Sequence, residues 1–366
     1  MTCFSGEQSR LEVVGEALAA MLEEDQQQEA GKVGVLEKAR EKFGPLCLSL
    51  PGELRRVVWE ESYLGRERGS QQRLRWVEKL ARKKVQESVR DLVRRWVVRQ
   101  YSDSRMLETW GRGTEEQLLT ARLLVLVCEG EGDLGQLFWL QPLIEGLEDW
   151  MDLESEEAVL EMSWRLDCLI SSCRLCEEEV HRLVDEVYLE LGERDPEYLE
   201  HLQEVSKEVE KVKTEDLLPG LLSPGEDGVT FWRQLMKAGG KMNSSKLRKV
   251  FTDGGKVYVR KWISEGFVSI LRKSSLCYLW DILFIHSWNL IIQHRVTLAI
   301  LLLLRPWVMR VDTFDKLQKT LLQVSNPLPD LFLQEPGLLY TSDLRQCLLH
   351  LQRGFTDPPP PSTNFR

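Results

Sequence analysis

Apolar residues in this sequence recur at helical spacing and almost nowhere at the alternating spacing of a half-buried strand. The clearest case steps by three and four residues, which places its members on one face of an amphipathic helix: Leu166, Leu169, Cys173, Cys176, Val180, Leu183 and Val187. Another helix is predicted over residues 118–127, because Thr114 and Gln117 just before it form a capping box and Gly130 follows it. The best strand signal, residues 257–259, is short. The sequence therefore predicts an all-α protein.

Charge and hydropathy limit the classes of function open to the chain. Its 366 residues carry 48 basic and 58 acidic side chains, a formal net charge of −10. This sign is opposite to that of a typical nucleic-acid-binding protein, so no nucleic-acid partner is expected. The longest strongly apolar run, residues 296–304, is about half a membrane span, and residues 1–31 have no apolar core typical of a secretory signal. We expect a soluble, cytoplasmic protein with no integral membrane segment, in which the eight cysteines are reduced thiols.

Charge and composition are uneven along the chain. Residues 66–99 carry twelve basic and four acidic side chains, and residues 145–157 carry seven acidic and no basic ones. Such runs are usual on solvated helix faces, and they can also steer a charged protein partner. Residues 217–255 contain Pro-Gly and Gly-Gly turn signals, which predict a loop-rich insertion, and four prolines at 358–361 predict an extended tail.

Motifs for self-contained enzyme chemistry are missing or out of context. The sequence lacks the G-x-x-x-x-G-K-[ST] pattern of a P-loop nucleotide hydrolase. A formal G-x-G-x-x-G occurs at Gly130, Gly132 and Gly135, but it follows a predicted helix and contains two acidic side chains that would repel a pyrophosphate. Cys173 and Cys176 have a zinc-like spacing, yet both lie on the apolar stripe, where cysteine packs as a small hydrophobe. We expect no bound metal and no cofactor.

Four separated stretches occur in the order found in one known helical family. The first, residues 50–59 (Leu-Pro-Gly-Glu-Leu-Arg-Arg-Val-Val-Trp), is followed by Leu64-Gly65 and is similar to an opening P-x-x-L-R-x-x-V-W…L-G helix. The second, residues 91–94 (Asp-Leu-Val-Arg), is similar to the D-x-x-R core of an I-x-x-D-x-x-R motif. The third, residues 133–136 (Asp-Leu-Gly-Gln), stands where the family carries G-Y-x-Q.

The fourth stretch is spread over the C-terminal half of the chain. Residues 195–203 (Asp-Pro-Glu-Tyr-Leu-Glu-His-Leu-Gln) are similar to a D-P-x-L-x-x-H-L segment. Trp262 and Phe267, then residues 279–284 and 295–302, are similar to a W-x-x-x-x-F…W-D-x-L-F…F-R-x-x-L-A-L-L sequence. Together the four stretches resemble the TBC (Tre-2/Bub2/Cdc16) domain of Rab GTPase-activating proteins, which is an all-helical, two-lobed domain.

The resemblance implies an activator of GTP hydrolysis that supplies two side chains to a partner GTPase. In this family an arginine enters in trans and neutralises charge developing on the phosphates, while a glutamine orients the attacking water. Residue-by-residue transfer makes Arg94 the arginine finger and Gln136 the glutamine finger. Asp91 would help to hold the loop that presents Arg94, and the neighbouring Arg95 leaves open which arginine points inward. Both Asp91 and Arg95 are expected on the partner-binding surface, whereas Asp281 would be structural.

Several positions depart from the family's pattern. The isoleucine that begins the arginine motif falls on Ser88, the tyrosine before the glutamine falls on Leu134, and the glycine after it falls on Leu137. Because catalysis requires close placement of the reacting groups, two functions stay open. One is a GTPase-activating protein for a GTP-bound Rab-type protein. The other is a catalytically degraded adaptor that binds a small GTPase or a complex subunit without accelerating hydrolysis.

The predicted organisation has three parts. Residues 1–44 form an N-terminal helical, acidic extension, residues 45–325 form the TBC-like domain with an insertion at about 204–256, and residues 326–366 form a C-terminal helix and a Pro-rich tail. No fixed-period self-similarity occurs, which argues against a helical-repeat scaffold. Recruitment to a membrane would depend on a partner.

Overall fold

The computed structural model describes residues 34–64, 139, 142–143, 156–211, 252–268, 270–271, 273–322 and 339–354. Within these residues the regular elements are ten α-helices and two short 3-10 helices, Gly44–Leu46 and Glu208–Lys211, and there is no strand. The all-α class is confirmed for this part of the chain. The α-helices are α2 (Val35–Phe43), α3 (Gly52–Leu64), α9 (Glu156–Cys173), α10 (Glu177–Arg194), α11 (Pro196–Lys207), α15 (Lys256–Ser264), α16 (Lys273–Ile285), α17 (Leu290–Val308), α18 (Phe314–Leu322) and α19 (Thr341–Gln352).

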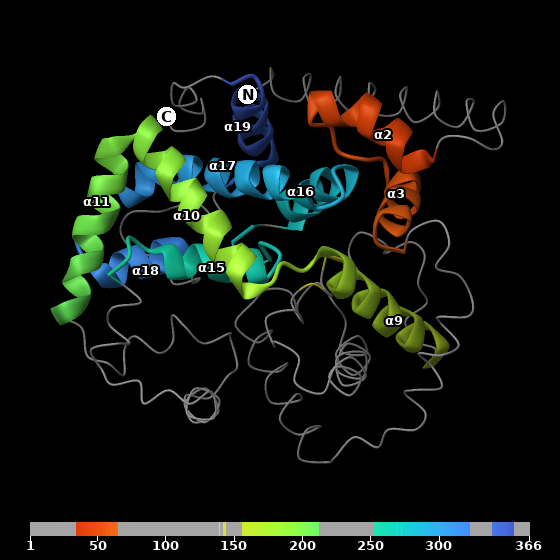
Figure 1. Cartoon of the computed structure of the whole chain (residues 1–366), viewed down its shortest axis with the longest axis horizontal. Helices are drawn as coiled ribbons and strands as arrows, with labels where there is room; N and C mark the ends of the chain where they lie inside the picture. Colours follow the sequence, from red (N-terminus) through yellow and green to blue (C-terminus); the bar gives the residue numbers. More distant parts are fainter. Residues whose placement is uncertain are drawn as a thin grey trace, which may run out of the picture.

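Helix α17 is the central element of the described fold. It contacts α10, α15, α16, α18 and α19. In Figure 1 it runs across the upper part of the molecule, with α19 rising from it, α15 and α18 below it and α11 on the outside. Helices α2 and α3 lie at the other end, beside α16 (Figure 1).

The length and composition of α17 would also allow it to cross a membrane. It has 19 residues, and its most apolar stretch of 18 residues has a mean hydropathy of 1.3. Of that stretch, 61% is buried inside the fold. Asn289 begins the helix by accepting a hydrogen bond from the backbone N–H of Ile292 at 2.9 Å. Burial against five other helices is the packing expected of a core helix.

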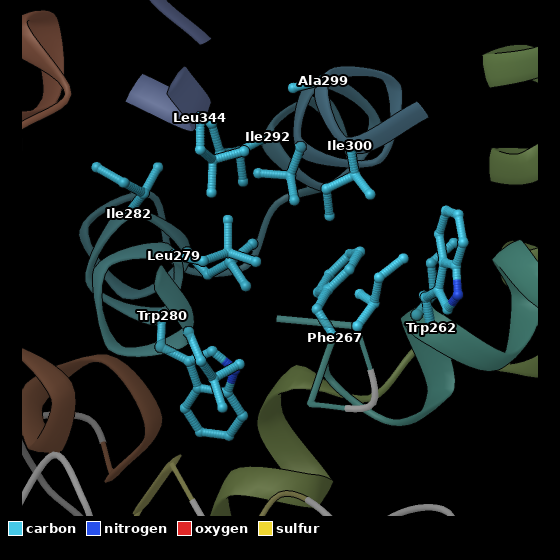
Figure 2. Close-up of a cluster of buried hydrophobic side chains, with 14 of the residues drawn as sticks. Trp262, Phe267, Leu279, Trp280, Ile282, Ile292, Ala299, Ile300 and Leu344 are labelled. Atoms are coloured by element: carbon cyan, nitrogen blue, oxygen red, sulfur yellow. The ribbon is translucent and has the colours of Figure 1, made fainter. Parts of the chain in front are cut away.

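One part of the hydrophobic core lies where α16, α17 and α19 meet. Figure 2 shows Leu279 of α16 facing Ile292 and Ile300 of α17, with Leu344 of α19 beside Ile292 and Phe267 closing the lower side. Leu279, Ile300, Leu344 and Phe267 are all 0% exposed. Burial of such side chains stabilises the fold by about 1.5–3 kcal/mol each relative to leaving them in water.

The predicted single helix through residues 166–187 is wrong, because the chain forms two helices there. Helix α9 ends at Cys173 and α10 begins at Glu177. The break occurs because Cys176 occupies the N-cap position of α10, where its backbone N–H donates to the Glu179 carboxylate at 2.9 Å. That hydrogen bond lowers the pKa of Glu179. Cys173 is buried as predicted, but Cys176 is exposed and does not belong to the apolar face.

Two other segments differ from the pattern read in the sequence. Residues 257–259, the best strand signal, lie in α15, because Tyr258, Val259, Trp262 and Ile263 together make one buried helical face. The first residues of the predicted insertion are also helical, since α11 continues to Lys207 and a 3-10 helix follows to Lys211.

The helices at the two ends of the described chain pack into the same core as the rest. Helix α2 contacts α3 and α16, and α19 contacts α16 and α17. Arg345 of α19 donates to the carbonyl oxygens of Leu46 and Cys47, at distances between 3.1 and 3.2 Å. The segment that leads into α3 is therefore held to α19 as well as to α16.

A buried carboxylate on α16 joins the N-terminal helices to the C-terminal core. Asp281 is 0% exposed. One of its oxygens accepts from Ser49 Oγ at 2.7 Å, from the Leu50 N–H at 3.0 Å and from Arg55 Nη2 at 3.0 Å. The other accepts from Arg55 Nε at 2.8 Å and from Trp59 Nε1 at 3.0 Å.

The charge of Arg55 is matched to this carboxylate. Burial acts to lower the pKa of Arg55, but the attraction and hydrogen bonds of Asp281 outweigh burial and raise that pKa. A buried charge without such partners would cost several kcal/mol. The expectation that Asp281 is structural therefore has a physical basis in five hydrogen bonds across the core.

We expect Asp281→Asn to lower the free energy of unfolding by about 3–5 kcal/mol, because it leaves Arg55 buried without a matching charge. Urea titration followed by circular dichroism measures the change. The matched control is Asp315→Asn on α18, which breaks an exposed pair with Lys319 (2.7 Å) and should change stability little. Equal unfolding midpoints for the two variants would contradict the role assigned to Asp281.

Candidate functional site

The four predicted site residues, Arg94, Gln136, Asp91 and Arg95, lie outside the described residues. The capping box at Thr114 and the glycine motif at Gly130 lie outside them as well. The described residue that follows Gln136 most closely in the sequence is Trp139, and the candidate site lies around it.

Trp139 is a buried anchor, meaning that its side chain is held in the core by one hydrogen bond and two ring contacts. Its side chain is only 2% exposed. The indole Nε1–H donates to the carbonyl oxygen of Ser264, at the end of α15, at 2.9 Å. The ring stacks on Trp288, with centroids 4.9 Å apart and an interplanar angle of 22°. It also meets Trp280 edge-on, at 5.9 Å and 78°.

The turn after α15, against which Trp139 packs, requires a glycine. Gly266 has a φ of +61°, which disfavours a side chain. A Cβ at this position would lie 3.0 Å from Trp139 Nε1 and 3.1 Å from Trp280 Cζ2. Trp280 Nε1 donates to the Gly266 carbonyl oxygen at 2.9 Å, so two indoles converge on one turn. The backbone conformation of this turn and the position of Trp139 are thus fixed together.

The aromatic cluster links this anchor to the buried carboxylate. Trp59, which donates to Asp281, lies 5.8 Å from Trp280 and 4.7 Å from Phe284 between ring centroids. Trp280 in turn contacts Trp288, at 5.2 Å, and Trp139. One continuous set of rings therefore runs from α3 to the segment that contains Trp139.

A second polar cross-link holds the start of α11 against α17. Asp195 caps α11 by accepting from the Tyr198 N–H at 3.0 Å, and its other oxygen accepts from Arg305 Nε. This hydrogen bond and the nearby carboxylate charges raise the pKa of Arg305. Tyr198 donates its hydroxyl to the Leu301 carbonyl oxygen at 3.1 Å. His201 Nε2 lies 2.9 Å from the Val308 carbonyl oxygen, so this nitrogen carries the proton and donates.

Four of the six described cysteines lie in the core. Cys47, Cys173 and Cys347 are buried free thiols. Burial raises the pKa of Cys47 to about 11 and that of Cys347 to about 12, so both are protonated at neutral pH. Among the residues that the structure describes, no group of three or more His, Cys, Asp or Glu side chains is placed to hold a metal ion.

Sequence reasoning missed two features of this region. Trp139 stands in a short apolar run at residues 137–140, and a tryptophan there was the available signal for a buried anchor. Arg165 gave no signal, since it stands just before the predicted apolar stripe and nothing in its sequence context marks it as buried. It pairs with Glu60 at 2.6 Å and donates to the Tyr63 hydroxyl at 3.2 Å, joining α9 to α3.

The described helices form one packed core that holds distant stretches of the chain side by side. Residues 49–59 meet Asp281, and the segment beginning at Asp195 meets α17. Stretches that lie far apart in the sequence thus share one core. No family model, no curated protein and no solved structure matches this chain.

Proposed function

We propose that this chain is a GTPase-activating protein for a Rab-type small GTPase, built on a two-lobed TBC-like helical domain. The observation that carries the proposal is the Asp281 cross-link. It joins residues 50–59 to residues 279–284, two of the stretches on which the resemblance to the TBC family rests. A chance match of short motifs gives no reason for the arginine and tryptophan of one motif to bind the aspartate of the other.

The contact between Asp195 and α17 supports the same proposal. Asp195, Tyr198 and His201 belong to the D-P-x-L-x-x-H-L-like segment, and all three side chains bond to α17 or its last turn. Helix α17 contains residues 295–302, the end of the same fourth stretch. The described members of the resembling stretches therefore act as one packed unit.

The proposed chemistry takes place in the active site of the partner. A small GTPase hydrolyses GTP slowly because little positive charge meets the transition state and the water is poorly oriented. Arg94 would insert its guanidinium and neutralise the charge that develops on the phosphates. Gln136 would orient the water, and Asp91 and Arg95 would contact the partner and support the loop of Arg94. The protein itself would need neither a metal nor a cofactor of its own.

Trp139 supplies a physical reason why Gln136 can be held in place without its usual neighbours. Trp139 is three positions after Gln136, and a segment of that length spans at most about 11 Å. The buried indole is fixed by a hydrogen bond and two ring contacts. In this proposal the anchor takes over the positioning that a tyrosine and a glycine beside the glutamine provide in the family, where this chain has Leu134 and Leu137.

The proposed setting is the cytoplasm, where a GTP-bound Rab-type protein would be met. The described cysteines are free thiols, which fits a reducing compartment. Binding to the GTPase, or to other subunits of a complex, would bring the chain to a membrane.

Single-turnover GTP hydrolysis by a panel of Rab proteins, with and without the full chain, tests the activity. We expect acceleration for one or a few members. Arg94→Ala and Gln136→Ala should each reduce the stimulated rate, the arginine change by about 10³-fold or more. Arg99→Ala and Gln141→Ala are the matched controls, since they make the same changes a few residues away. A flat panel with folded protein would contradict the activator and favour the adaptor.

The positioning role of Trp139 has its own test. Trp139→Phe keeps a stacked ring but removes the hydrogen bond to Ser264, and we expect between about 10- and 100-fold loss of stimulated rate from misplacement of Gln136. Trp288→Phe is the control, because it makes the same change in the same stacked pair. The buried Nε1 of Trp288 has no hydrogen-bond partner in the part of the chain that the structure describes. Equal losses for the two variants would show that only ring packing matters.

A further inference from the structure

A cavity opens where the α9–α10 junction meets α15 and α17. Its volume is about 300 Å³, at the lower end of the range for small-ligand sites. Trp139, Ser264 and Gln293 contribute to its walls. Leu175, Val180 and Ile263 add apolar surface, so the cavity has an apolar wall beside a hydroxyl and an amide.

The charged groups around this cavity are all potential cations. Arg174, at the break between α9 and α10, His181 on α10 and Arg260 on α15 line it. No aspartate or glutamate is among the described residues of the lining. A site with this lining favours an anion over a neutral or cationic ligand.

Arg260 differs from the other cations of its helix. Lys256 pairs with Asp185 at 2.8 Å, and Lys261 pairs with the buried Glu265. Arg260 has no carboxylate within salt-bridge distance among the described residues, and its side chain is half-buried against the cavity. Its guanidinium can therefore offer a planar pair of donors to a ligand, as arginine does for phosphate and carboxylate groups.

We propose that this cavity binds a phosphate monoester. Such a group carries close to two negative charges at neutral pH, and its three oxygens can accept both donors of the half-buried Arg260 guanidinium in a cavity whose other charged groups are potential cations. The organic part of the ligand would pack on the indole of Trp139, with the Ser264 hydroxyl beside it. The phosphate monoester can belong to a free metabolite or to a lipid headgroup. This proposal is independent of the proposed effect on a GTPase. Binding of a phosphate monoester to the cavity is measured with the chain alone, so the two proposals can fail separately.

The test is direct binding of two probes to the full chain. Glycerol phosphate, followed by isothermal titration calorimetry, represents the free ligand. Phosphatidylcholine vesicles with and without phosphatidic acid, followed by sedimentation, represent the same headgroup on a lipid. Binding of either probe supports the phosphate site, and the arm that binds more tightly identifies the source.

Three variants give the test its specificity. Arg260→Gln should weaken binding by about tenfold or more, because it removes a charge-assisted contact. Ser264→Met should abolish binding by filling the cavity without changing the charge. Arg182→Gln is the matched control: Arg182 is an exposed arginine of α10, next to His181 and outside the cavity lining, and its loss should leave binding within about twofold of the parent.

Three results would overturn the proposal. The first is that neither probe binds the folded parent protein. The second is an equal loss in Arg260→Gln and Arg182→Gln, which would mean that surface charge alone attracts the anion. The third is displacement of glycerol phosphate by an equal concentration of succinate, which would show that the cavity does not distinguish a phosphate from carboxylates.

Discussion

The carboxylate of Asp281 is the interaction on which the rest of the described structure depends. It is fully buried and accepts five hydrogen bonds from residues more than two hundred positions earlier in the chain. An ionised group can stay in a hydrophobic core only if such donors surround it. The segment at residues 49–59 must therefore dock on α16 whenever the core forms. This requirement joins the beginning and the end of the described chain into one unit.

From this carboxylate, an aromatic path leads to the region of the proposed chemistry. Trp59 donates to Asp281 and contacts Trp280, and Trp280 meets Trp139. Each indole N–H of these three rings finds an acceptor: Asp281, the Gly266 carbonyl and the Ser264 carbonyl. Tryptophan suits this use because it combines a large apolar surface with one directional donor. The same Trp139 side chain lines the cation-rich cavity, so the anchor and the proposed ligand site share a wall.

Periodicity in the sequence was sufficient to predict the helical class of the described residues and the burial of Cys173, because both follow from which residues avoid water. It failed at Cys176, where spacing by three and four continued through a helix break that is marked by the capping box between Cys176 and Glu179. Asp281 was predicted to be structural, but the four residues that donate its five hydrogen bonds come from positions that local patterns cannot connect. The cavity beside Arg260 gave no sequence signal, since it arises from four segments brought together by folding. The assignments of Arg94, Gln136, Asp91 and Arg95 depend on motif resemblance and stay predictions.

The most direct test of the proposed activity is complex formation with a transition-state analogue. A protein that supplies charge and a water-orienting group to GTP hydrolysis binds most tightly to the geometry of the transition state. We predict that the chain co-elutes in gel filtration with a GDP-loaded Rab protein only when aluminium fluoride is present, and that Arg94→Ala abolishes this complex. Binding to the GTP-loaded protein with no gain from aluminium fluoride would contradict the proposed activity.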